Sequence, residues 1–209
     1  MASLGGENNK IRLENLVGCE NWAMLLSRET AALKVYKRKM SDDSDHRKEL
    51  QHRVDDIKQR LNAGMVRDGS SYMELADGKR TPSSAHEATI AVVSMIFALS
   101  ALIYLQVTIY GCAPDGTDTV NKLLFRVMLN VRFLPDAQLL PNLAWPICIA
   151  GCMATTPSQE QFFKDLLAWP NVQGRGYETL RQALEVMEIC WEQRVLRARS
   201  RLGGTGRGL

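Results

Sequence analysis

Hydrophobic residues recur along most of this chain at steps of three and four, which is the period of an α-helix. Residues 45–63 show the pattern well, because one apolar stripe runs through densely charged positions. No segment shows the strict alternation that predicts a β-strand. The pattern therefore predicts an all-α fold, an irregular domain of about six or seven helices. The expected helices are at residues 20–39, 45–63, 84–111, 119–131, 146–154, 158–168 and 177–199.

One expected helix differs from the others because it is apolar on every face. Residues 88–112 carry no charged side chain over 25 positions, a length that would span a bilayer. Ser94, Ser100 and Gln106 lie within this run, and no cluster of Lys or Arg closely flanks it, which argues against a membrane span. We therefore interpret it as a central helix surrounded by others, ending near Gly111 in a left-handed C-cap. A membrane-associated helical protein is the alternative.

Local sequence signals indicate where helices begin and where the domain has a linker and flexible ends. Ser84 with Glu87, and Ser158 with Gln161, have the spacing of capping boxes that begin helices. Residues 64–84 are rich in Gly, Ser, Asp and Pro, and predict a mobile linker within the domain. The expected organisation is a flexible N-terminus at residues 1–10, a single helical domain at residues 11–199, and a flexible Arg/Gly tail at residues 200–209.

Composition narrows the classes of function. With 209 residues, 45% of them hydrophobic, the chain can bury a sizeable core. The net charge is only +3, from 26 basic and 23 acidic residues, so no overall field marks a binder of nucleic acid or membrane surfaces. The five cysteines are odd in number and lie mostly among apolar residues, which favours buried thiols in a reducing compartment. The first residues do not have the pattern of a secretory signal peptide.

Candidate chemistry is sparse in this sequence. Cys148 and Cys152 lie one helical turn apart and could reach one metal ion, but their apolar surroundings favour free buried thiols. His46, His52 and His86 are interpreted as solvated or capping residues. No motif for a nucleophile, a zinc protease or a phosphate loop is present. We therefore predict that the chain is not an enzyme, with no catalytic, cofactor-binding or metal-binding residues. The alternative is an enzyme whose site is not recognisable from sequence.

Two segments of the last third resemble the fungal-specific transcription factor domain. In that family a W-P pair leads into an apolar I-A-G-C-x-A helix, and a later helix ends in W-x-x-R. Here the first motif is LAWPICIAGCMA at residues 143–154, and the second is ALEVMEICWEQR at residues 183–194. Weaker matches occur at residues 18–22 and 101–105. The resemblance therefore covers most of the chain.

This resemblance implies a regulatory domain in a nuclear regulator of metabolic or secondary-metabolite genes. Such domains lie C-terminal to a zinc binuclear cluster that binds DNA, and they carry no cofactor and no chemistry. The sequence contains no C-x-x-C motif, so DNA binding is expected only through a zinc-cluster module absent from this chain. The implied partners are other proteins of the transcription machinery or a second copy, with a small-molecule effector also allowed, and no membrane.

The two motifs also have a physical interpretation. Ala150, Gly151 and Ala154 are small enough to let another helix approach closely, and Trp145 and Trp191 are large enough to anchor that contact. We therefore predict that Trp191 packs in the core against the helix at residues 146–154.

Overall fold

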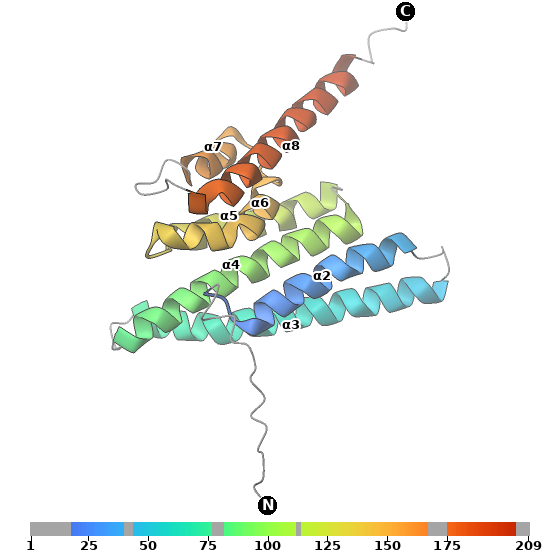
Figure 1. Cartoon of the computed structure of the whole chain (residues 1–209). Coiled ribbons are helices and arrows are strands. Elements are labelled where there is room, and N and C mark those ends of the chain that lie inside the picture. The colour runs from blue at the N-terminus through green and yellow to red at the C-terminus, as the bar shows by residue number, and fades with distance from the viewer. Residues whose placement is uncertain (1–17, 40–43, 77–81, 112–113, 167–174, 204–209) are drawn as a thin grey trace, which may run out of the picture.

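The computed structural model of the chain describes residues 18–39, 44–76, 82–111, 114–166 and 175–203 (Figure 1). These residues form seven α-helices and short 3-10 segments, and no β-strand occurs among them. The all-α prediction is therefore confirmed. The elements are α2 (Asn21–Lys39), α3 (Ser44–Ala76), α4 (Pro82–Tyr110), α5 (Pro114–Arg132), η1 (Ala137–Leu143), α6 (Ala144–Gly151), α7 (Pro157–Asp165), η3 (Arg175–Tyr177) and α8 (Glu178–Gly203).

Helix α4 is the centre of the fold. In Figure 1 it lies between the α2 and α3 pair on one side and α5 with α6 on the other, and it contacts all four. Although residues Ala85–Tyr110 are long and apolar enough to cross a membrane, 67% of their most apolar window is buried in the protein. The other helices therefore account for its apolar faces, as expected of a core helix.

The polar residues of α4 fit this buried position because they bind backbone groups of neighbouring segments. The Ser94 hydroxyl accepts a hydrogen bond from the Glu20 N–H at 2.8 Å. The Ser100 hydroxyl donates to the Pro146 carbonyl at 3.0 Å. Both serines are buried, so each bond satisfies a group that would otherwise be costly to bury. The two polar residues thus tie α4 to the start of α2 and to α6.

The end of α4 confirms the predicted glycine cap. Gly111 has a φ of 72°, in the left-handed region, and its N–H donates to the Val107 carbonyl at 3.0 Å. The Lys37 ammonium, at the end of α2, donates to the carbonyls of Thr108 and Ile109 at 2.9 and 2.8 Å. A cation at these free carbonyls is favourable because the C-terminal end of a helix is electronegative.

The boundary predicted between the second helix and the linker was wrong. Helix α3 continues through residues 64–76, where the sequence suggested a connection beginning at Gly64. The glycine is buried under the indole of Trp22, and Met65 beside it is 5% exposed. Packing against α2 therefore stabilises a helix that local composition disfavours. Residues 77–81 of the expected linker lie outside the described residues, as do residues 1–10 and 204–209, while α8 continues to Gly203.

Several helix starts also differ from the prediction. The N-cap of α7 is Thr156, with extended backbone, and its side chain pairs with the Gln159 N–H in a capping box two residues earlier than the predicted Ser158 box. Pro157 then occupies the first turn, where its missing N–H costs nothing. Helix α4 similarly begins at Pro82, before Ser84.

Candidate functional site at the joint of α6 and α8

Helix α6 carries the first sequence motif and is fixed to the core on its α4 side. Pro146 lies in its first turn, where proline is well tolerated. The indole of Trp145 stacks on Phe97 of α4 at a centroid distance of 6.1 Å and meets Tyr104 edge-on at 6.3 Å. The prediction that Trp145 anchors the contact with the later helix is therefore incorrect, because its aromatic partners are on α4.

Gly151 provides the close approach between α6 and α8. A Cβ atom at this position would lie 1.8 Å from the Sδ of Met187 and 3.3 Å from the Phe163 ring. Trp191 is 5% exposed, and its indole N–H donates to the Gly151 carbonyl at 2.8 Å. The predicted packing of Trp191 against this helix is confirmed. The hydrogen bond also satisfies both buried polar groups.

Arg194 completes the joint from the next turn of α8. Its guanidinium donates to the Cys152 carbonyl at 2.6 Å and also to the Ala154 carbonyl. These carbonyls follow the end of α6, where helix geometry leaves acceptors without intrahelical donors. The tryptophan and the arginine of the W-x-x-R motif are three positions apart on α8. Trp191 binds the Gly151 carbonyl, and Arg194 binds the carbonyls of Cys152 and Ala154. The sequence alone does not indicate this role for Arg194.

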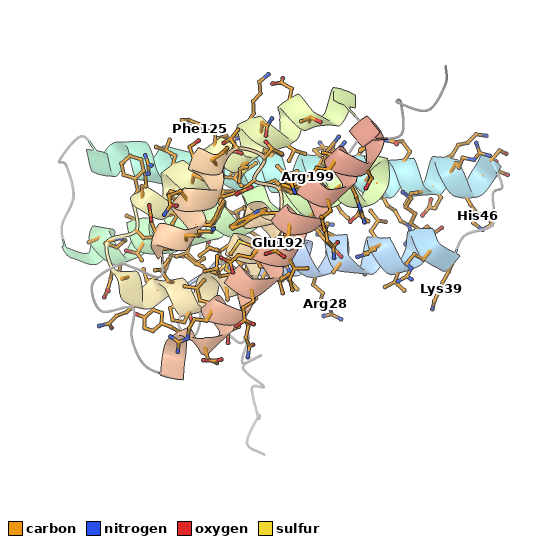
Figure 2. All side chains as sticks on the ribbon, turned by 90° about the horizontal axis from the view of Figure 1, so that it is seen from above. Arg28, Lys39, His46, Phe125, Glu192 and Arg199 are labelled. Carbon is orange, nitrogen blue, oxygen red and sulfur yellow. The ribbon has the colours of Figure 1, made fainter. Side chains whose placement is uncertain are left out.

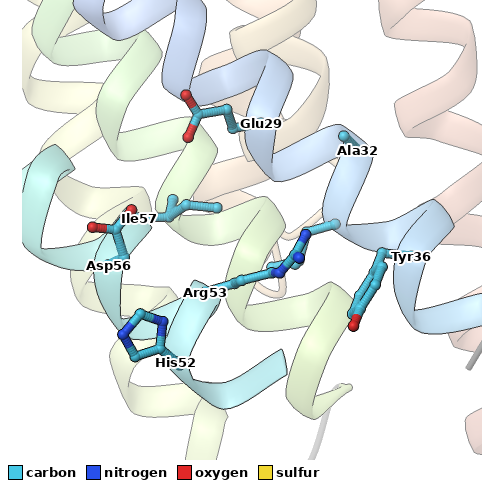
Figure 3. Close-up of a pocket in the computed structure, with 8 residues that line it drawn as sticks. Glu29, Ala32, Tyr36, His52, Arg53, Asp56 and Ile57 are labelled. Carbon is cyan, nitrogen blue, oxygen red and sulfur yellow. The ribbon is translucent and has the colours of Figure 1, made fainter. Parts of the chain in front are cut away.

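A shallow pocket of about 360 Å³ lies elsewhere, between α2 and α3 (Figure 3). Its charged groups pair with their neighbours: Arg60 bonds Glu29 and Asp56 at 2.8 and 3.1 Å, and Arg53 bonds Glu49 at 2.6 Å. The hydrogen bond from Arg53 lowers the pKa of Glu49. The full lining is Glu29, Ala32, Leu33, Tyr36, His52, Arg53, Asp56 and Ile57. The pocket therefore consists of surface ion pairs above an apolar floor. Its charged groups do not converge on one point in the way that the groups of a reactive centre do.

Of the other candidate residues, the three histidines lie on α3 and α4, and the two cysteines lie at the C-terminal end of α6. His46, His52 and His86 are all exposed, in agreement with the interpretation as solvated residues. Cys148 and Cys152 are half-buried free thiols. Among the described residues, no group of three or more His, Cys, Asp and Glu side chains has an arrangement that could hold a metal ion.

By its fold the described part of the chain is an all-helical domain. At the joint, residues of the two sequence motifs hold α6 and α8 together. Comparison with known proteins then identifies the family. The model of the fungal specific transcription factor domain matches residues 2–199. The chain belongs to this family. No solved structure matches it.

Curated relatives support the same assignment. A trichothecene biosynthesis transcription regulator of Trichoderma arundinaceum is 29% identical over 184 residues, which are 88% of this chain and 40% of that protein. Transcription factor dibT of Pestalotiopsis microspora is 26% identical, over 93% of this chain and 32% of that protein. A pestheic acid cluster transcriptional regulator of Pestalotiopsis fici is 24% identical, over 89% and 33%. The chain thus spans 40% or less of the length of these relatives.

Proposed function

We propose that this chain is the regulatory domain through which a nuclear transcription regulator controls the genes of one biosynthetic pathway. The observation that carries the proposal is the family match over residues 2–199, together with relatives named as regulators of biosynthesis. The structure supports it because the family's motif residues form a helix joint instead of a reactive centre. The domain then acts through contacts with other molecules, and not through chemistry of its own.

Deleting the gene in the organism that encodes it tests this function. We expect transcripts from one contiguous group of biosynthetic genes to fall, while transcripts of housekeeping genes stay unchanged. RNA sequencing of the deletion strain beside the parent and a complemented strain gives the measurement. An unchanged transcript profile under conditions in which the parent expresses its biosynthetic genes would contradict the proposal.

The C-terminal part of α8 is the surface that we assign to protein contact. A groove of about 510 Å³ lies where α7 approaches α8. Beyond Arg194 every described side chain of α8 is exposed, including Val195 at 49% and Leu196 at 59%. The C-terminal end of α8 extends beyond the helices on which it packs (Figure 1). Two adjacent apolar residues exposed on a projecting helix offer a surface that a partner can cover.

The charges on this surface match a second copy of the same chain. Glu192 and Arg199 both line the groove, and their spacing of about two helical turns places both along the same stretch of α8 (Figure 2). If two α8 helices pair antiparallel about Val195 and Leu196, Glu192 of each copy lies opposite Arg199 of the other. The apolar pair is then covered at the centre, and one ion pair closes each side, in the self-complementary form of a two-fold interface. A second copy is therefore the partner that we propose.

Charge reversal tests this pairing directly. We expect the parent to show a concentration-dependent monomer–dimer equilibrium in sedimentation velocity. Glu192→Arg should shift it to monomer, because each interface would then hold two pairs of facing arginines. The double variant Glu192→Arg with Arg199→Glu should restore the dimer. A parent that stays monomeric at all concentrations, or a double variant no better than the single one, would rule out the second copy.

A further inference from the structure

Three of the five cysteines meet at the joint of α6 and α8 although they are distant in sequence. Cys148 lies on α6, Cys152 is the C-cap residue one turn later, and Cys190 directly precedes Trp191 on α8. All three are free and half-buried. Both other thiols are close enough to the Cys152 thiol to raise its pKa. Neither the family assignment nor the proposed function gives these thiols a role.

The register of the two helices fixes which thiols can bond. Arg194 holds the Cys152 carbonyl at 2.6 Å, and Cys190 lies one turn before Arg194 on the same helix face. The indole of Trp191 holds the Gly151 carbonyl at 2.8 Å. These two bonds hold the turn of α8 that carries Cys190 against the end of α6 that carries Cys152.

A disulfide between Cys148 and Cys152 is disfavoured by the geometry of the helix. The Cys152 N–H donates to the Cys148 carbonyl at 2.9 Å, so the spacing between the two residues is helical. Cβ atoms four residues apart on a helix are about 5–6 Å from each other, whereas a disulfide requires about 3.5–4.5 Å. A Cys148–Cys152 disulfide would therefore need the end of α6 to unwind, which the bonds from α8 oppose.

We propose that Cys152 and Cys190 form an oxidation site that takes hydroperoxides and becomes a disulfide linking α6 to α8. One sulfur attacks the outer oxygen of the peroxide, the O–O bond breaks, and the alcohol or water leaves with a proton. The second sulfur attacks the resulting sulfenic acid, the S–S bond forms, and hydroxide leaves with the second thiol proton as water. The two thiols supply the two electrons that reduce the peroxide.

The surroundings of the thiols indicate which one reacts first. Hydrogen bonding to Cys148 and burial raise the pKa of the Cys152 thiol, and the thiolate is the nucleophilic form. Within the proposed pair, Cys152 is therefore the less reactive sulfur toward the peroxide, and it acts in the second step. Because Cys190 is the direct neighbour of Trp191, the indole fluorescence should report the change.

Peptide mapping of the full chain tests the proposal. The protein is treated with hydrogen peroxide, its remaining thiols are alkylated, and it is digested with trypsin. Cys148 and Cys152 fall in the fragment at residues 133–164, and Cys190 in the fragment at residues 182–194. We expect these two fragments to appear joined, with the mass of two hydrogen atoms lost, and to separate on reduction with dithiothreitol.

Variants separate the proposed pair from the third thiol. Cys190→Ser should abolish the joined fragments, while the matched control Cys148→Ser should retain them. If either variant fails to fold, mapping of the parent by fragmentation between Cys148 and Cys152 still identifies the bonded sulfur. A disulfide within residues 133–164, a link only between molecules, or sulfinic acid on separate thiols would overturn the proposal.

Discussion

Replacing Trp191 with alanine is expected to remove a large part of the stability of the domain, with a loss of about 3–5 kcal/mol. The indole is 5% exposed, and its N–H donates a hydrogen bond to the buried Gly151 carbonyl. The substitution removes the ring and the donor together, so a cavity is left in the core and the Gly151 carbonyl keeps only its bond from the Ala154 N–H. Because domains are stable by only about 5–15 kcal/mol, a marginal one would unfold. Thermal unfolding followed by circular dichroism measures the effect.

The matched control lies two residues away on the same helix. Ile189 is 53% exposed, and Ile189→Ala should leave the unfolding midpoint close to that of the parent, as expected for most exposed positions. The opposite pattern has a clear meaning. If Trp191→Ala melts like the parent but the strain carrying it loses transcription of the biosynthetic genes, the indole is a contact residue for a partner and not a core residue.

The features that the sequence predicted correctly rest on local repetition. The 3.6-residue period identified the helices because each one must bury a single stripe, and α4 was recognisable because it has no polar face. The place of Trp191 followed from the size of its ring and from the small residues at Ala150 and Gly151. Each of these predictions depends on the residue types within a segment, and not on how distant segments are placed in space.

The features that the sequence did not predict depend on contacts between distant segments. Arg194 is one of many arginines in the sequence, and only the register of α8 against α6 shows that it binds the carbonyls that end α6. The meeting of Cys190 with Cys152 depends on the same register. The start of α7 was misplaced because Thr156 and Ser158 are both good caps, and the extended backbone at Thr156 decides between them.

Gly64 shows most clearly how a tertiary contact can reverse a local signal. By composition it begins a loop, yet it is buried within α3 because the Trp22 indole of α2 lies directly over it. Arg67 fixes that ring from the next turn, with its guanidinium 5.6 Å from the ring centroid and bonded to Glu20 at 2.8 Å. Because Gly64 has no side chain, it makes room for the Trp22 indole.

Replacing Gly64 with alanine is accordingly expected to destabilise the domain, although alanine is the better helix former. The added Cβ would lie 2.4–2.5 Å from three atoms of the Trp22 ring, and a rigid ring cannot bend away as a flexible chain can. Overpacking of this kind costs about 1–3 kcal/mol or somewhat more, against a helix-propensity gain of about 1 kcal/mol. We expect a lower unfolding midpoint in chemical denaturation. Gly176→Ala is the control, because a Cβ at that position meets nothing within 4 Å.

A double-mutant cycle tests whether the loss of stability in Gly64→Ala comes from the contact with the Trp22 indole. In the Trp22→Leu background the ring is gone, so Gly64→Ala should lose its penalty and become neutral or stabilising, since only the propensity gain remains. The coupling free energy between the two positions should then be about 1–3 kcal/mol, within the range of about 0.5–3 kcal/mol for residues in contact. If Gly64→Ala stabilises the parent, or if its effect is the same with and without the Trp22 ring, the glycine is present for another reason.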